Sequence, residues 1–98
     1  MFGGGDANKI YDGKITGNVT DGESQKPLEL ANIALYYAGE DKPLDGTVTD
    51  EKGNFKLKNI KPGDYTLSVT AIGFQSLTRA ISVSSSLTVN LVLDTATN

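Results

Sequence analysis

Oxygen-bearing side chains gather around one glycine near the middle of this 98-residue sequence. The stretch TDEKGNF, residues 49–55, contains Asp50, Glu51 and Asn54, and Asp45 lies just upstream. Carboxylate and amide oxygens are the ligands that Ca²⁺ prefers, so these four residues form a candidate calcium site. The same letters also favour a tight turn, in which Asp50 accepts hydrogen bonds from backbone amides and Gly53 takes a positive φ.

The spacing of these residues favours the turn. A calcium loop of the common kind follows the pattern D-x-[DN]-x-[DN]-G and ends in a bidentate Glu at its twelfth position, and this stretch has neither feature. We therefore interpret TDEKGNF as a turn that closes a hairpin and directs Phe55 into the core. We predict no resident metal or cofactor, with weak calcium binding as the alternative.

Cys, His and Trp are absent from the whole sequence. Thiol nucleophiles, thiolate zinc sites and imidazole bases are therefore excluded. Adjacent carboxylates at Glu40–Asp41 and Asp50–Glu51 are the remaining candidates for acid–base chemistry. A catalytic pair needs a pocket that raises the pKa of one member, whereas neighbours on a strand point to opposite faces. We predict that the chain has no catalytic residues and is not an enzyme.

Charge and hydropathy limit the partners of this chain. The formal net charge is −3, which gives no bulk attraction to nucleic acid. Lys56, Lys58 and Lys61 are close in sequence, but we expect them to form a solvated face that discourages edge pairing. No apolar run reaches the roughly 20 residues of a membrane helix, so we expect no direct membrane insertion.

Three large side chains fall outside the main inward alternation. Tyr36, Ile72 and Phe74 are candidates for a surface that contacts a neighbouring domain or a partner. The alternative is that Phe74 covers one end of the core and that the other two are isolated exposed residues.

Alternating apolar residues predict seven short strands separated by Gly, Pro, Asp and Ser. The predicted strands cover residues 14–20, 32–37, 46–50, 54–60, 64–72, 75–83 and 87–93. This pattern predicts an all-β, seven-stranded Greek-key sandwich. We expect residues 1–10 to be a flexible leader or expression remnant, residues 11–93 to be the domain, and residues 94–98 to begin a linker.

The inward residues and turns also form a longer sequence motif. It comprises Gly17-x-Val19-x-Asp21, Pro27-Leu28, Ala31-Asn32-Ile33, Gly46-Thr47-x-Thr49-Asp50-x-x-Gly53-x-Phe55-x-Leu57 and Pro62-Gly63-x-Tyr65-x-Leu67-x-Val69-x-x-x-Gly73-Phe74. This motif resembles the carboxypeptidase regulatory-like domain family, whose fold is similar to transthyretin (prealbumin). The sequence departs from the motif at Glu29-Leu30, where the family often has Pro-Gly.

The resemblance implies a non-catalytic function. TDEKGNF, KPGDY and AIGF look most like the form found N-terminal to TonB-dependent outer-membrane receptors of Bacteroidetes-type bacteria. That placement implies an accessory domain at the periplasmic face of the outer membrane, with the adjacent plug and barrel or a periplasmic protein as partners. Two alternatives are an extracellular module that binds carbohydrate or a surface, and a regulatory domain cut from a metallocarboxypeptidase.

Overall fold

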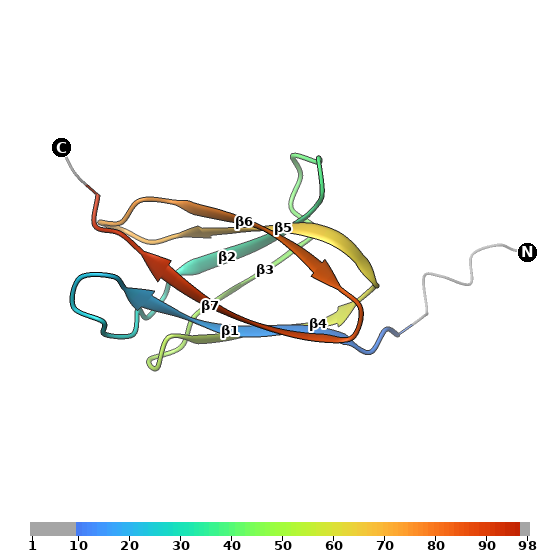
Figure 1. Ribbon diagram of the computed structural model, residues 1–98, viewed down its shortest axis with the longest axis horizontal. Coiled ribbons are helices and arrows are strands. Elements are labelled where there is room, and N and C mark those ends of the chain that lie inside the picture. Colours follow the sequence, from blue (N-terminus) through green and yellow to red (C-terminus); the bar gives the residue numbers. More distant parts are fainter. Residues whose placement is uncertain (1–9, 97–98) are drawn as a thin grey trace, which may run out of the picture.

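The computed structural model describes residues 10–96, and these residues form seven strands. The strands are β1 (Gly13–Asp21), β2 (Asn32–Tyr37), β3 (Asp45–Val48), β4 (Asn54–Ile60), β5 (Gly63–Thr70), β6 (Leu77–Val83) and β7 (Ser86–Leu93). The predicted all-β, seven-stranded Greek-key sandwich is thus confirmed (Figure 1). Most of the proposed leader, residues 1–9, and residues 97–98 of the proposed linker lie outside the described residues.

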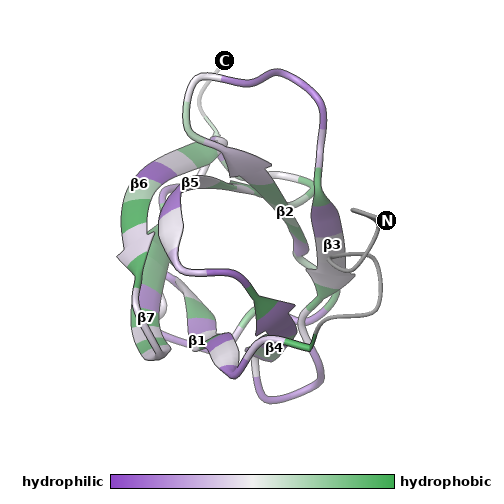
Figure 2. Ribbon diagram, turned by 90° about the vertical axis from the view of Figure 1, so that its right-hand side faces the viewer, coloured by the Kyte–Doolittle hydropathy of each residue, from purple (hydrophilic) through white to green (hydrophobic). Residues whose placement is uncertain are grey.

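The strands form two sheets that face each other across the core. One sheet has three strands in the order β4-β1-β7, and the other has four in the order β3-β2-β5-β6. Viewed along the strands, the two sheets enclose the interior (Figure 2). Within the described part of the chain, no helix is long and apolar enough to cross a membrane.

Side chains at alternate positions of both sheets fill the core, as the period-two pattern predicts. Ile15 and Val19 of β1 face Leu35 of β2 and Leu67 of β5, and all four are completely buried. Arg79 of β6 is a polar exception to this pattern and is exposed between the half-buried Leu77 and Ile81. The remaining buried apolar residues are Ala31, Ile33, Phe55, Leu57, Ile60, Tyr65, Val69, Val83, Leu91 and Leu93.

The first and last strands are parallel neighbours. Their register pairs Lys14 with Ser86 at one end and Asp21 with Leu93 at the other. Parallel neighbours begin at the same end of a sheet, so the start of β1 and the end of β7 lie at opposite ends of the domain. Figure 1 shows the chain entering at one end of the sandwich and leaving at the other.

The prediction of a hairpin between the third and fourth strands is wrong. β3 pairs with β2 in the four-stranded sheet, and β4 pairs with β1 in the three-stranded sheet. The turn at residues 50–53 therefore carries the chain from one sheet to the other. A hairpin and a crossing between sheets use the same turn residues, so local sequence does not distinguish them.

The chain stays attached to the fold after β7. The Gln75 amide donates to the Asp94 carbonyl at 2.8 Å, and the Ala96 amide donates to the Gly73 carbonyl at 2.9 Å. Residues 94–96, which the sequence places in a linker, thus pair with the connection between β5 and β6.

Candidate functional site

The TDEKGNF stretch forms the predicted turn. One carboxylate oxygen of Asp50, Oδ1, accepts hydrogen bonds from the backbone amides of Lys52 and Asn54, both at 2.9 Å. The Gly53 amide donates to the Asp50 carbonyl at 2.9 Å, and Gly53 has a φ of 77°. The Asp50 carboxylate therefore satisfies the amides of its own turn.

Gly53 also fastens this turn to the three-stranded sheet. The Val19 amide donates to the Gly53 carbonyl at 2.8 Å. A Cβ at Gly53 would lie 2.7 Å from the Val19 carbonyl oxygen, which is too close for any side chain. Phe55 follows on β4 and is buried, as predicted.

The four candidate calcium ligands do not converge on a common coordination site. Asp45 begins β3 and its Oδ1 accepts a hydrogen bond from the Gly46 amide at 2.8 Å, whereas Asp50 follows the other end of that strand. Glu51 is exposed in the turn, and Asn54 begins β4. Across residues 10–96, no three acidic, His or Cys side chains gather in a group that could hold a metal ion.

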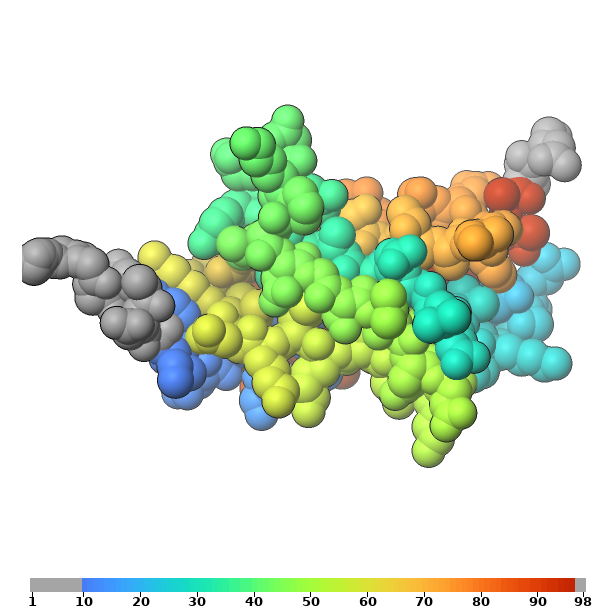
Figure 3. All heavy atoms as spheres, turned by 180° about the vertical axis from the view of Figure 1, so that it is seen from behind, coloured from blue at the N-terminus to red at the C-terminus, as the bar shows by residue number. Residues whose placement is uncertain are grey.

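The candidate acid pairs lie in exposed connections. Glu40 and Asp41 are both exposed in the connection between β2 and β3, which projects from the sandwich (Figure 3). Asp50 and Glu51 are exposed in the turn described above. Neither pair is enclosed by a pocket of the kind that acid–base catalysis requires.

The three residues proposed as an interaction surface do not form one patch. Tyr36 pairs with Thr66 near one end of the four-stranded sheet and is half-buried. Ile72 is fully exposed beyond the other end of β5, and nearby Phe74 packs against the core. Thr66 lies four residues, or roughly 13 Å, from the end of β5 at Thr70, and Ile72 lies beyond that end, so Tyr36 and Ile72 are not neighbours.

A basic surface is assembled instead on the outer face of the three-stranded sheet. Lys56 and Lys58 point outward from β4, as expected, whereas Lys61 lies beyond the end of that strand. Lys14, on the neighbouring strand β1, also faces outward beside them. Sequence reasoning missed Lys14 because it is more than 40 residues away, and the antiparallel register of β1 with β4 is the signal that finds it.

Uncharged polar residues complete this outer face. Asn18 is paired on one side with Asn54 and on the other with Asn90, so three asparagines form a row across the sheet. Thr16 similarly lies between Lys56 and Thr88. We call this surface the lysine–asparagine face. It consists of Lys14, Thr16, Asn18, Thr20, Asn54, Lys56, Lys58, Ser86, Thr88, Asn90 and Val92.

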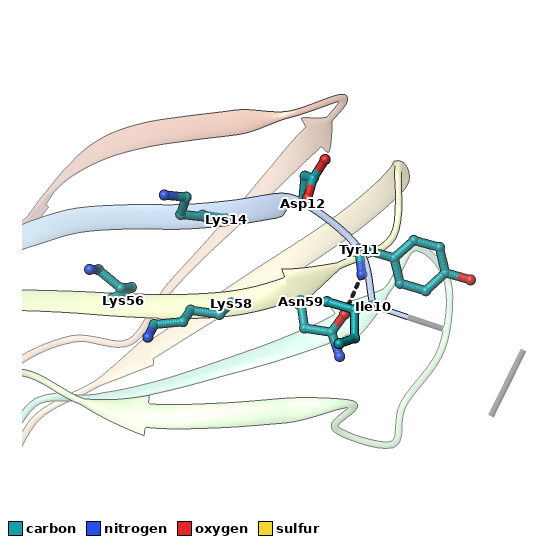
Figure 4. Close-up of a pocket in the computed structure, with 7 residues that line it drawn as sticks. All are labelled: Ile10, Tyr11, Asp12, Lys14, Lys56, Lys58 and Asn59. Atoms are coloured by element: carbon teal, nitrogen blue, oxygen red, sulfur yellow. Dashed lines mark hydrogen bonds between the residues drawn. The ribbon is translucent and has the colours of Figure 1, made fainter. Parts of the chain in front are cut away.

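One end of the lysine–asparagine face opens into a shallow depression of about 490 Å³. Lys14, Lys56 and Lys58 line it, with Ile10, Tyr11, Asp12 and Asn59 at the end nearer the start of the chain (Figure 4). The Tyr11 amide donates to Asn59 Oδ1 at 2.6 Å, and Asn59 has a φ of 58°. Three ammonium groups and one carboxylate give this depression a positive balance, which suits contact with an anionic group.

The chain belongs to the CarboxypepD_reg-like domain family, whose sequence profile matches residues 15–98. Colossin-A of Dictyostelium discoideum is 43% identical to this chain over 54 residues. The matched segment is 55% of this chain and, to the nearest per cent, 0% of Colossin-A. The chain thus spans a minute part of that relative. The resemblance found in the sequence is therefore confirmed at the level of the family.

Solved structures of similar fold come from proteins of different kinds. The minor pilin GBS52 of Streptococcus agalactiae has a TM-score of 0.72 at 21% identity, over 91% of this chain and 47% of the pilin chain. A DUF3823 family protein of Bacteroides uniformis has a TM-score of 0.66 at 15% identity, over 82% of this chain and 42% of that protein. These identities establish the shared fold alone.

Enzymes also use this fold. The 5-hydroxyisourate hydrolase of Klebsiella pneumoniae has a TM-score of 0.66 at 15% identity, over 89% of this chain and 89% of the hydrolase. Fold therefore does not decide between enzyme and accessory domain. Membership of a regulatory-like family suggests a non-catalytic domain, in keeping with the chemistry of the chain, which contains no His and no Cys.

Proposed function

We propose that this carboxypeptidase regulatory-like domain is a non-catalytic accessory module of a longer outer-membrane protein of the TonB-dependent receptor type. The module lies on the periplasmic side and acts by contact with the adjacent plug and barrel or with a periplasmic protein. Two observations support the proposal. The family match covers residues 15–98, and within it TDEKGNF, KPGDY and AIGF resemble the form of the domain found N-terminal to TonB-dependent receptors.

The observation that carries the contact function is the composition of the lysine–asparagine face. Its eleven outward residues include three lysines and no carboxylate, although the whole chain has a net charge of −3. The asparagine and threonine side chains on this face both donate and accept hydrogen bonds. Such a face is suited to a partner surface that carries carboxylates, because complementary charge orients the encounter and selects the partner.

The alternative of a carbohydrate-binding module has weaker support. Flat sugar-binding surfaces commonly rely on exposed aromatic rings, which pair an apolar body with polar contacts. Within residues 10–96, Tyr37 is the most exposed aromatic residue, at 46% exposure, and its ring stacks on Tyr65 with a centroid separation of 5.5 Å. The lysine–asparagine face carries no aromatic side chain.

Site-specific thiol labelling of the full-length protein in cells tests this placement. The domain contains no Cys, so Ser85→Cys introduces a single exposed label site within it. We expect a membrane-impermeant maleimide to label this variant only after the outer membrane is permeabilised. The same protein without the added cysteine controls for thiols elsewhere in the full-length chain. Labelling in intact cells would contradict the periplasmic placement and favour the extracellular module.

The reading frame around the domain provides a second, independent test. We expect a signal peptide upstream, and downstream a plug followed by many alternating segments of about 10 residues that build a membrane barrel. A zinc peptidase in the same frame would instead favour the regulatory domain of a metallocarboxypeptidase. Further sandwich domains without a barrel would favour a surface module.

A further inference from the structure

The paired stretch between β1 and β7 runs the length of the three-stranded sheet. Eight residue pairs join the two strands, from Lys14–Ser86 to Asp21–Leu93, without a shift in register. At about 3.3 Å per residue, this paired stretch is about 23 Å long. Because the two strands are parallel, the chain enters at one end of the stretch and leaves at the other (Figure 1).

Hydrogen bonds close the pair at both ends. The Lys14 amide donates to the Ser85 carbonyl at 3.1 Å where β1 begins. The Gly22 amide donates to the Leu93 carbonyl at 2.9 Å where β7 ends. In a parallel pair the bonds between these two limits are evenly spaced, so the ladder extends along the whole stretch.

After β7 the chain is hydrogen-bonded to the connection between β5 and β6. The Asp94 carbonyl accepts from the Gln75 amide at 2.8 Å, and the Ala96 amide donates to the Gly73 carbonyl at 2.9 Å. Phe74 and Thr95 lie opposite each other between these two bonds. A pull applied beyond Ala96 therefore loads these two bonds before it reaches the end of β7 at Leu93.

Tension between the two ends of the domain loads this pair in shear. The inter-strand hydrogen bonds run across the strands, whereas the force runs along them, so many bonds must strain together before any strand slides. Sliding would also move the completely buried Ile15 and Val19 past Leu91. A force that peels the strands from one end would instead break the bonds one at a time.

We infer that the domain is a force-bearing link, which keeps its fold when the segments before and after it are pulled apart. This function follows from the position of β1 and β7 and is independent of the compartment in which the full-length protein works. A force-bearing link must unfold slowly when it is pulled along its own axis, because the unfolding rate governs resistance to force. The free-energy barrier to unfolding must therefore be high along that axis.

Single-molecule pulling along two axes of the same domain tests this inference. The absence of Cys allows each axis to be defined by two introduced cysteines at exposed positions. Ile10→Cys with Ala96→Cys loads the β1–β7 pair in shear. Ile10→Cys with Ser85→Cys places both handles at the end where β1 and β7 begin, and so peels the two strands apart.

We expect the rupture force along the shear axis to be several-fold higher than along the peeling axis at the same loading rate. Equal forces, or a higher force along the peeling axis, would overturn the inference. Urea unfolding of both variants without handles checks that they fold equally well. If either variant is destabilised, fusing the unaltered chain between two marker domains of known unfolding force measures the shear axis without any substitution.

Discussion

The hydroxyl of Thr49 accepts a hydrogen bond from the backbone amide of Ala31 at 2.9 Å, and both residues are buried. The same hydroxyl donates to the Leu28 carbonyl at 2.6 Å. The backbones of the two segments are also joined, because the Thr49 amide donates to the Ala31 carbonyl at 3.0 Å. Thr49 thus fastens the connection between β1 and β2 to the end of β3.

Replacing this hydroxyl is expected to destabilise the domain. Thr49→Val keeps the shape of the side chain but leaves the Ala31 amide and the Leu28 carbonyl without this partner. Leaving buried polar groups unsatisfied costs about 1–3 kcal/mol each, so we expect a loss of that order in the free energy of unfolding. Urea denaturation measures it. Thr49→Ser, which retains the hydroxyl and loses only a methyl group, should lose less. Unchanged stability of Thr49→Val would show that packing alone matters here.

Leu30 offers a stabilising substitution. It has a φ of 62°, which is a strained conformation for leucine, and its side chain is 67% exposed. Relief of the strain, typically 1–3 kcal/mol, outweighs the entropy cost of glycine, so we expect Leu30→Gly to raise the free energy of unfolding by about 1 kcal/mol. Leu30→Ala is the matched control, because it removes the side chain and keeps the strain. A gain with alanine but not with glycine would contradict this account.

A calcium titration distinguishes the two interpretations of TDEKGNF, a cation site and a simple turn. Because the Asp50 carboxylate accepts two amides of its own turn, we expect Ca²⁺ in millimolar excess to leave the melting temperature unchanged. Asp50→Ala should lower stability by about 1–2 kcal/mol with or without the ion. A calcium-dependent rise in melting temperature that Glu51→Gln removes would establish a cation site.

Tyr65 makes stability depend on pH in the alkaline range. Burial raises the pKa of this phenol above its ordinary value of 10.0, and Tyr37 and Tyr11 raise it further. The neutral phenol also donates a hydrogen bond to the Lys61 carbonyl. The unfolded chain therefore ionises first, so the contribution of Tyr65 is fully present below pH 10 and is lost as the pH rises through the folded pKa.

Unfolding curves at increasing pH above 9 measure this effect. We expect the free energy of unfolding of the natural chain to fall more steeply with pH than that of Tyr65→Phe. The difference between the two proteins isolates Tyr65 from the other tyrosines. Parallel pH profiles would show that the buried phenol has no raised pKa.

The sequence predicts the bounds of the strands better than it predicts which strands pair with one another. The bounds of β2 and β4 coincide with the predicted strands, because each is a short alternating run between turn residues. The turn at Asp50 and Gly53 was also predictable, since a side-chain acceptor and a residue that tolerates positive φ are local requirements. Each of these features depends on a few adjacent residues.

The pairing of strands that are distant in the sequence could not be predicted from local sequence patterns. The neighbours of β1 are β4 and β7, and the register with β7 joins residues 72 positions apart, as in the hydrogen-bonded hydroxyls of Thr16 and Thr88. The lysine–asparagine face exists only once these three strands are side by side. Alternation likewise did not show how far apart Tyr36 and Ile72 lie, because the side that a residue faces does not fix its neighbours.

The position of β7 also limits when the domain can fold during its synthesis. β1 is the first strand made and the middle strand of its sheet, and β7, one of its two partners, is the last. Until residue 93 has left the ribosome, β1 presents an unpaired edge that other chains could join. Folding can therefore be completed only after translation of nearly the whole domain, and truncation within β7 should yield a chain that aggregates.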